Sequence, residues 1–167
     1  MKNFSKLALL ALFIASGTFV TSCSDDDKAA EPASLYAKLG GTTMVADPNN
    51  PGQMIEQGRL SYRSVVDSTI TLIVSDIVVG AEGNLGEHFA PVISEALSGN
   101  ATNVAILSDN LTDFFSANTG GGATNVYTGL DMVTAHDPAQ NPRMGKKSND
   151  AEYDKFIGYV GAAAGLN

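Results

Sequence analysis

The stretch YTGLDMVTAH, residues 127–136, is the part of the sequence that is most informative about the fold. Met132 and His136 are four residues apart, so on a helix their side chains share one face. A neutral imidazole beside an apolar wall is the arrangement that a five-coordinate haem iron requires on its proximal side. A lone histidine is more often structural than a ligand, so the stretch by itself leaves both interpretations open.

Two neighbouring stretches predict amphipathic helices. Over residues 104–115 the apolar side chains recur at helical spacing, and polar ones such as Asn110 lie mostly opposite them. Asn103 or Thr102 is the expected N-cap, and the glycine triplet that follows ends the helix. A last helix is expected over residues 149–164. Its apolar stripe is formed by Tyr153, Phe156, Ile157, Val160 and Ala164.

The segments before these helices are less decisive. Residues 34–41 (SLYAKLGG) predict a short helix that Ser34 caps and the glycine pair ends. Residues 47–52 (DPNNPG) are a loop by composition. Residues 60–79 contain a β-branched run that favours a strand, yet several of the same residues fall on one helical face. Local pattern alone leaves this last segment open.

Taken together with these segments, the stretch at 127–136 resembles the proximal region of the truncated haemoglobins, group 1 in particular. The resemblance covers about residues 34–167, with long insertions, and its motifs follow the family's order along the chain. The matching segments are 34–41 for the N-terminal motif, 65–67 for the start of helix B, 110–115 with 120–121 for helix E, and 144–145 with 150–159 for the last helices.

The resemblance implies an all-α fold, a truncated globin-like two-over-two helical sandwich with inserted loops, which holds a haem b. It also implies that residues 64–76 are helical and that His136 is the proximal ligand of the haem iron. Met132 is expected to pack against the haem rather than to bind the iron. The other haem-contacting positions are expected at Tyr127, Phe115, Leu111, Leu107, Phe89 and Ile70.

The distal side departs from the family pattern. The position of the family's tyrosine on helix B falls at Ile70, and its polar positions on helix E fall near Leu107 and Leu111. Hydrogen-bond donors on this side decide whether bound oxygen is held or activated. A pocket without a donor favours carbon monoxide or nitric oxide over oxygen. A nitric-oxide dioxygenase activity needs better distal chemistry and a reductase, so a non-enzymatic gas-binding protein is the stronger expectation.

Two further residues have open roles. His88 is either a solvated loop histidine or a sixth iron ligand from the distal side. Asp137 is a candidate for orienting the His136 imidazole, although a backbone carbonyl serves this purpose equally well.

The N-terminus predicts export. Lys2 and Lys6 accompany an apolar run over residues 7–20, which is too short to span a bilayer comfortably and is typical of a signal peptide. The sequence VTSC, which ends at Cys23, resembles a bacterial lipobox. The resemblance implies that the chain is cut before Cys23 and that this cysteine is lipidated.

The sequence therefore predicts three segments. Residues 1–22 are the lipoprotein signal peptide, and residues 23–33 are an acidic flexible tether. This tether resembles the surface-export signal of lipoproteins from the Bacteroidetes group. Residues 34–167 form the haem domain. The expected location is the outer membrane, on its periplasmic or its surface face.

Composition limits the classes of partner. The chain has 18 acidic and 10 basic residues and a net charge of −8, which argues against nucleic acid. Its one cysteine excludes an internal disulfide framework. The expected partners are a diatomic gas, a membrane through the lipid on Cys23, and an unidentified electron donor. The alternatives are a lipoprotein that captures or relays haem and a globin-fold interaction lipoprotein that has lost it.

Overall fold

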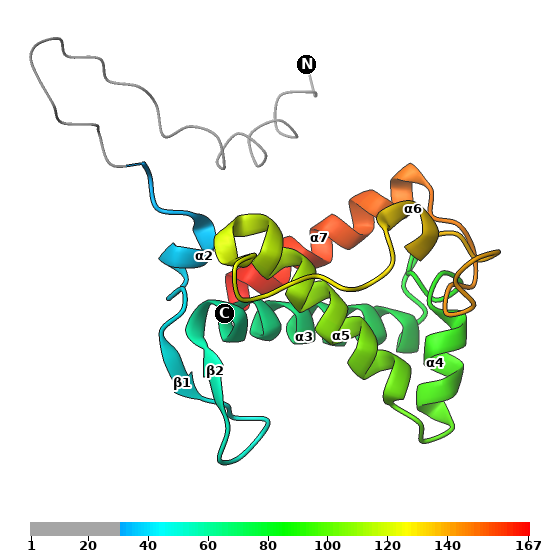
Figure 1. Ribbon diagram of the computed structural model, residues 1–167. Coiled ribbons are helices and arrows are strands. Elements are labelled where there is room, and N and C mark those ends of the chain that lie inside the picture. The colour runs from blue at the N-terminus through cyan, green and yellow to red at the C-terminus, as the bar shows by residue number, and fades with distance from the viewer. Residues whose placement is uncertain (1–30) are drawn as a thin grey trace, which may run out of the picture. The chain divides into compact units, whose positions relative to one another are not determined.

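Three long helices form the frame of the protein, and a computed structural model describes them within residues 31–167 (Figure 1). They are α3 (Gln57–Val78), α5 (Thr102–Ser116) and α7 (Asp150–Leu166), and α3 packs against the other two. The signal peptide, Cys23 and most of the tether predicted from the sequence lie outside the described residues. Among the helices of residues 31–167, none has the length and apolar character needed to cross a bilayer.

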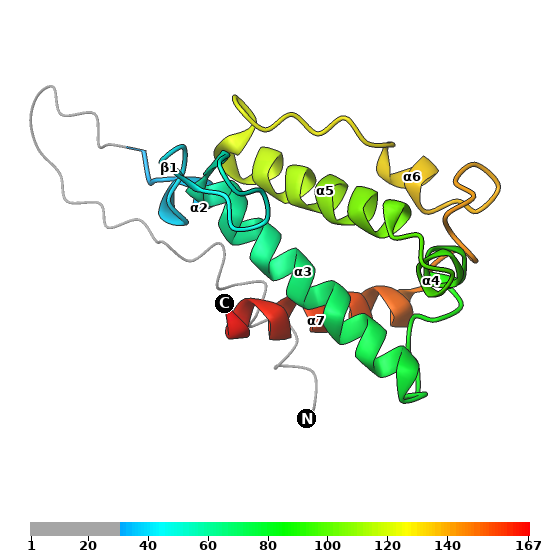
Figure 2. The ribbon, with the colours of Figure 1, turned by 90° about the horizontal axis from the view of Figure 1, so that it is seen from below.

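Short elements precede the first long helix or connect one long helix to the next. In Figure 2, α5 and α7 lie apart, and the short helix α4 lies at one end between them. Strands β1 and β2 form an antiparallel hairpin in which Val45 is opposite Ile55. The short elements are α2 (Leu35–Lys38), β1 (Met44–Ala46), β2 (Met54–Glu56), α4 (Ala90–Leu97), the π-helical turn η1 (Ala117–Gly121) and α6 (Met132–Ala135).

The prediction for the first helix is confirmed. Ser34 is the N-cap of α2, and its hydroxyl accepts a hydrogen bond from the Ala37 amide at 3.2 Å. Gly40 and Gly41 follow the helix with φ of 108° and 54°, values that favour glycine. The sequence thus specifies both ends of this element.

The loop predicted over residues 47–52 is the turn of the β1–β2 hairpin, whose two strands the sequence analysis did not predict. Asp47 begins the turn and accepts hydrogen bonds from Asn49 and Asn50. Its carboxylate also forms a buried ion pair with Arg63 of α3, with Nη2 to Oδ1 at 2.6 Å. These contacts hold the pKa of Asp47 below its ordinary value, with the Arg63 hydrogen bond as the main cause. This ion pair therefore joins the turn of the hairpin to the long helix, into which β2 leads directly.

The segment that local pattern left open between strand and helix is part of α3. The hydroxyls of Thr69 and Thr71 donate to the carbonyls of Val65 and Asp67 at 2.8 and 2.9 Å, so these threonines bond within the helix. Val66 and Ile73 are 1% and 6% exposed. Tertiary burial therefore overrides the strand preference of the β-branched run.

Helix α5 covers the predicted range, but the predicted N-cap is wrong. Ala101 occupies the cap position, and the side chain of Asn100 accepts a hydrogen bond from the Thr102 amide at 3.0 Å. Helix α5 passes directly into η1, where Gly120 has a φ of 114°. A Cβ on Gly120 would overlap Ser34, so this turn and the start of α2 need a glycine here.

Helix α7 begins with a capping box. The side chain of Asn149 accepts from the Glu152 amide, and the Glu152 carboxylate accepts from the Asn149 amide, both at 3.0 Å. The last helix predicted from the apolar stripe is thus confirmed. One core cluster joins α3, α4 and α7 and consists of Ile73, Leu85, Phe89, Met144 and Tyr159.

Candidate functional site

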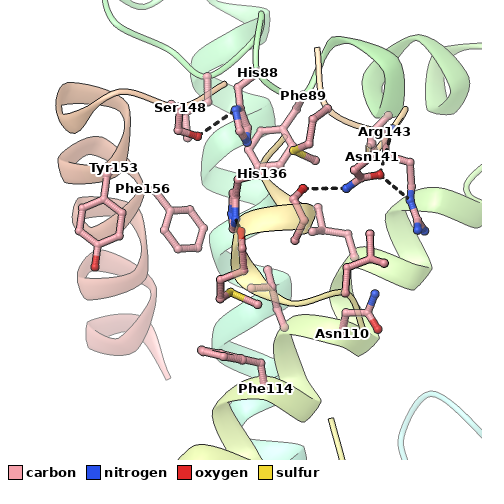
Figure 3. Close-up of a pocket in the computed structure, with 18 of the residues that line it drawn as sticks. His88, Phe89, Asn110, Phe114, His136, Asn141, Arg143, Ser148, Tyr153 and Phe156 are labelled. Carbon is pink, nitrogen blue, oxygen red and sulfur yellow. Dashed lines mark hydrogen bonds between the residues drawn. The ribbon is translucent and has the colours of Figure 1, made fainter. Parts of the chain in front are cut away.

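A cavity of about 560 Å³ lies against α5, α6, α7 and the start of α4 (Figure 3). Apolar side chains from all four helices form most of its wall. Those from α5 are Ile106, Leu107, Leu111, Phe114 and Phe115, and those from α7 are Phe156, Ile157 and Val160. Its polar wall includes His88, Asn103, Asn110, His136, Asn141, Arg143, Ser148 and Glu152.

Much of the apolar stripe of helix α5 lines this cavity. Its fully buried residues are Thr112 and Ser116, both 0% exposed, and their hydroxyls have no hydrogen-bond partner among the described residues. The leucines and phenylalanines of the same helix instead line the cavity. An amphipathic helix ordinarily buries its apolar face against protein. In α5 much of this face borders the cavity and not protein, which indicates an apolar ligand.

Helix α7 shows the same division. Tyr159 and Ala163 are 8% and 0% exposed, and the Tyr159 hydroxyl donates to Asp76 of α3 at 2.7 Å. Phe156 and Val160 line the cavity, as do the exposed side chains of Tyr153 and Ile157. Two helices thus contribute apolar surface to one space that protein atoms do not fill.

His136 stands at the C-cap of α6, and its ring lies in the cavity wall. Nδ1 is 2.8 Å from the Met132 carbonyl oxygen, one helical turn earlier. Because a carbonyl only accepts, we assign the proton to Nδ1, which leaves the Nε2 lone pair for a metal or another donor. Of the two orienting partners that the sequence left open, the structure has the carbonyl. Asp137 instead accepts from Ala139 and Gln140.

The YTG motif builds the approach to α6. The Tyr127 hydroxyl donates to the Leu130 carbonyl at 2.6 Å, and a Cβ on Gly129 would overlap the Tyr127 ring. Asp131 then caps α6 by accepting from the amides of Val133 and Thr134. Burial, together with Asp131, raises the pKa of Tyr127 above its ordinary value. These contacts position Met132 and His136.

His88 is the polar side chain of the wall that is most deeply buried, at 5% exposure. It precedes Phe89, the N-cap of α4, and packs edge-on against that ring with centroids 4.7 Å apart. Its Nδ1 lies 3.1 Å from the Ser148 hydroxyl oxygen (Figure 3). Burial, followed by the charge of His136, lowers the pKa of His88, so its ring is held in the neutral form. It is therefore not the solvated loop histidine that was one interpretation of the sequence.

Charged groups surround one side of the cavity. Lys146 lies between Glu152 and Glu87, with Nζ to oxygen distances of 2.7 and 3.0 Å. The Lys146 hydrogen bond is the main cause that lowers the pKa of Glu152. Arg143 lines the wall, and its backbone amide donates to the Asn141 side chain at 3.2 Å. A ligand with an apolar body and an anionic end would match this wall.

A series of aromatic rings leads from the cavity to α2. Ring centroids are 5.5 Å apart from Tyr127 to Phe114, 5.9 Å to Phe115, 6.0 Å to Tyr62 and 6.4 Å to Tyr36. At the far end, the Tyr36 hydroxyl contacts Glu56 and Asn125. Burial and this carboxylate raise the pKa of Tyr36 to about 12. The cavity and the hairpin end of the protein are thus connected by packed rings.

The structure places every haem-contacting residue predicted from the sequence in the cavity wall except Ile70, whereas the predicted lipidation site Cys23 lies outside the described residues. Those in the wall are His136, Met132, Tyr127, Phe115, Leu111, Leu107 and Phe89. Ile70 is half-buried on α3 and is not part of the wall.

The sequence analysis did not identify Asn103 and Asn110 as residues of the cavity wall, and it placed Asn110 opposite the apolar stripe of the helix. Asn103, Leu107 and Asn110 are spaced so that they share one helical face, and this spacing could have identified the two asparagines.

The described residues contain no cluster of three or more histidine, cysteine or acidic side chains able to hold a metal ion. The chain matches no protein-family model, no curated protein and no solved structure.

Proposed function

We propose that the protein binds haem b through His136 and takes up a diatomic gas, oxygen, nitric oxide or carbon monoxide, in the same cavity. The observation that supports this best is the His136 ring in the cavity wall, with Nδ1 fixed by the Met132 carbonyl. This contact favours the tautomer with the proton on Nδ1 and directs the lone pair of Nε2 to the incoming group, as a proximal ligand requires. When bound, the haem iron would supply the coordination position for the gas.

The wall fits the group on three counts. Its volume of about 560 Å³ lies in the range of cavities that bury small organic ligands. Leu107, Leu111 and Phe115 supply the apolar surface that a porphyrin face needs. Arg143 supplies a guanidinium that suits a carboxylate at the edge of the ring. These residues would hold the group, while His136 would bind its iron.

We further propose that the helices form a truncated-globin-like arrangement. The packing of α3 on α5 and α7 supports this, as does a short helix α6 that ends at the histidine. Leu107 and Leu111 offer a bound gas no hydrogen bond, whereas the Asn110 amide adds a polar group to the wall. The chain's own side chains thus exclude water on one face and offer few polar contacts to the gas.

A hemin titration tests the haem proposal. The purified protein should bind one equivalent with a strong Soret band in the ferric, ferrous and carbon-monoxide forms, and His136→Ala should lose or alter it. Met132→Leu is the matched control, because it keeps the backbone carbonyl that holds Nδ1. Binding that is indifferent to His136 would overturn the proposal.

Haem capture and relay is a second candidate, favoured by the openness of the wall. Met132, Ile157 and Tyr153 line the cavity and are 41%, 45% and 62% exposed. An exposed wall permits exchange, which a gas-binding protein should resist. Transfer of hemin to apomyoglobin separates the two: a relay protein gives up its hemin readily, and a gas-binding protein keeps it.

We also propose that the protein is an exported lipoprotein anchored to the outer membrane through Cys23. The support is the position of the chain's one cysteine at the end of the lipobox-like sequence. Mass spectrometry of the membrane-bound protein should find a lipidated Cys23 at the N-terminus, and Cys23→Ala should remain unprocessed. An uncut chain in the unmodified protein would contradict this.

A further inference from the structure

The rings of His88 and His136 lie opposite one another across part of the cavity. Their centroids are 6.2 Å apart and their planes are inclined by 26° (Figure 3). His136 comes from the end of α6, and His88 comes from the segment before α4, so two separate parts of the chain bring them together.

This separation fits two imidazoles that share one metal. Metal–nitrogen bonds of about 2.0–2.1 Å on both sides, with each nitrogen about 1.1 Å from its ring centre, place the centroids about 6.2–6.4 Å apart. Direct ring stacking at van der Waals contact would bring the centroids much closer.

The nitrogen atoms are arranged consistently. Nδ1 of His136 is held by the Met132 carbonyl, and Nδ1 of His88 is held by the Ser148 hydroxyl. With the proton of each ring on Nδ1, donated to the Met132 carbonyl and to the Ser148 hydroxyl oxygen, Nε2 is the atom that each ring offers to a metal. Outer contacts of this kind orient ligating histidines and set their tautomer.

His88 is also fixed in place along its backbone. Its carbonyl accepts from the Gly145 amide at 2.7 Å, and a Cβ on Gly145 would overlap the Glu87 backbone. The neighbouring ring of Phe89 packs edge-on against it. A side chain that is 5% exposed and held by contacts on several sides keeps its position without a ligand.

We infer that His88 is the second axial ligand of the iron, opposite His136. The inference rests on the proposed haem function and specifies how that site is regulated. A diatomic gas would then bind only after His88 leaves the iron. The protein would control gas access through its own side chain, in place of the distal hydrogen-bond donors that Leu107 and Leu111 do not provide.

The test is the spin state of the iron after hemin is added to the purified protein. The unmodified ferric form should be low-spin by absorption and electron paramagnetic resonance. His88→Ala and His88→Leu should bind hemin but be high-spin, and added imidazole should restore the low-spin spectrum. Asp109→Asn, an exposed position of α5 outside the cavity wall, should stay low-spin.

The outcomes separate the two proposals. An unmodified protein that binds hemin in a high-spin form, or His88 variants that remain low-spin, would overturn the His88 assignment and leave haem binding intact. Failure of the unmodified protein to bind hemin would overturn both. A low-spin signal lost equally in Asp109→Asn would also count against His88.

A measurement on the unmodified protein keeps the inference testable if the variants do not fold. The rate of carbon monoxide binding to the ferrous form should reach a plateau as its concentration rises, because departure of His88 becomes limiting. A rate that rises linearly over the whole range would overturn the inference.

Discussion

Individual residues set the position of the His136 ring. The Met132 carbonyl, and not a side chain, orients His136, so the identity of residue 132 matters less than the helical turn it belongs to. That turn exists because Asp131 caps it and because Gly129 lets the Tyr127 ring fold over the backbone. The YTG motif therefore acts on the histidine through backbone position.

Gly129→Ala should disturb this position. The new Cβ would overlap the Tyr127 ring, so we expect a loss of roughly 1–3 kcal/mol in the free energy of unfolding and weaker hemin binding. Gly158→Ala in α7 is the matched control, because its Cβ meets open space. It should be neutral or stabilising by up to about 1 kcal/mol. Urea denaturation and hemin titration measure both effects; equal behaviour of the two variants would contradict the argument.

Single elements are joined to the frame by few polar contacts, and the hairpin shows this best. The pKa of Asp47 is lowered in the folded protein, mainly by Arg63, so its charge stabilises the fold above the unfolded pKa of about 3.9. This contribution is lost as the pH falls below that value. We expect Asp47→Asn to be less stable at pH 7 and to lose less stability than the unmodified protein between pH 5 and 2.

Urea denaturation across this pH range measures the difference. Asp109→Asn is the control, because the Asp109 side chain is 68% exposed and lies 3.6 Å from Arg59. It should follow the unmodified protein. If Asp47→Asn showed the same pH dependence as the unmodified protein, the buried ion pair would not be the fastening contact.

The capping box at the start of α7 is a second polar contact that holds a single element in place. Asn149→Ala removes the side-chain acceptor of the Glu152 amide and should cost about 1 kcal/mol of stability. Because α7 forms one wall of the cavity, hemin affinity should fall with it. Asp154→Ala, an exposed position later in the same helix, should change neither. Thermal denaturation of both variants measures the stability that each loses. Equal losses would show that the capping box does not stabilise α7 more than an exposed side chain does.

The elements were predictable where the sequence carries a repeated pattern or a cap. Helices α7 and α5 were predictable because their apolar side chains repeat over several turns, and the short α2 because Ser34 and the glycine pair mark its ends. The hairpin was missed because strands of three residues show no alternation, and α4 was missed because eight residues carry few repeats. In α3 the β-branched residues favoured a strand, but the segment is helical because the helix buries Val66 and Ile73.

The parts of the candidate site that lie within one short stretch of sequence were predictable. His136 and its wall on α5 could be identified because they lie in short motifs and on one helical stripe. The burial of His88 could not, because its partner Ser148 is 60 positions away and only the fold brings them together. The prediction that Ile70 lines the cavity was wrong for a similar reason, because the direction of its side chain depends on how α3 packs against the other helices.

In the whole molecule, the apolar faces of α5 and α7 line one cavity, so we expect the free energy of unfolding to depend on what fills it. A ligand that binds only the folded protein adds about 2.7 kcal/mol at a concentration of 100 times its Kd. Hemin should therefore raise the melting temperature of the unmodified protein clearly and that of His136→Ala much less. Differential scanning calorimetry measures this; an unchanged melting temperature would contradict hemin as the occupant.

The ring series from Tyr127 to Tyr36 has an optical consequence. The chain has five tyrosines and no tryptophan, so its ultraviolet emission comes from phenol rings alone. Tyr127 and Tyr153 lie in the cavity wall, and Tyr62 and Tyr36 are joined to it through stacked neighbours. A chromophore that enters the cavity lies within energy-transfer range of these emitters. The protein thus carries its own fluorescent reporter of occupancy, which needs no added dye.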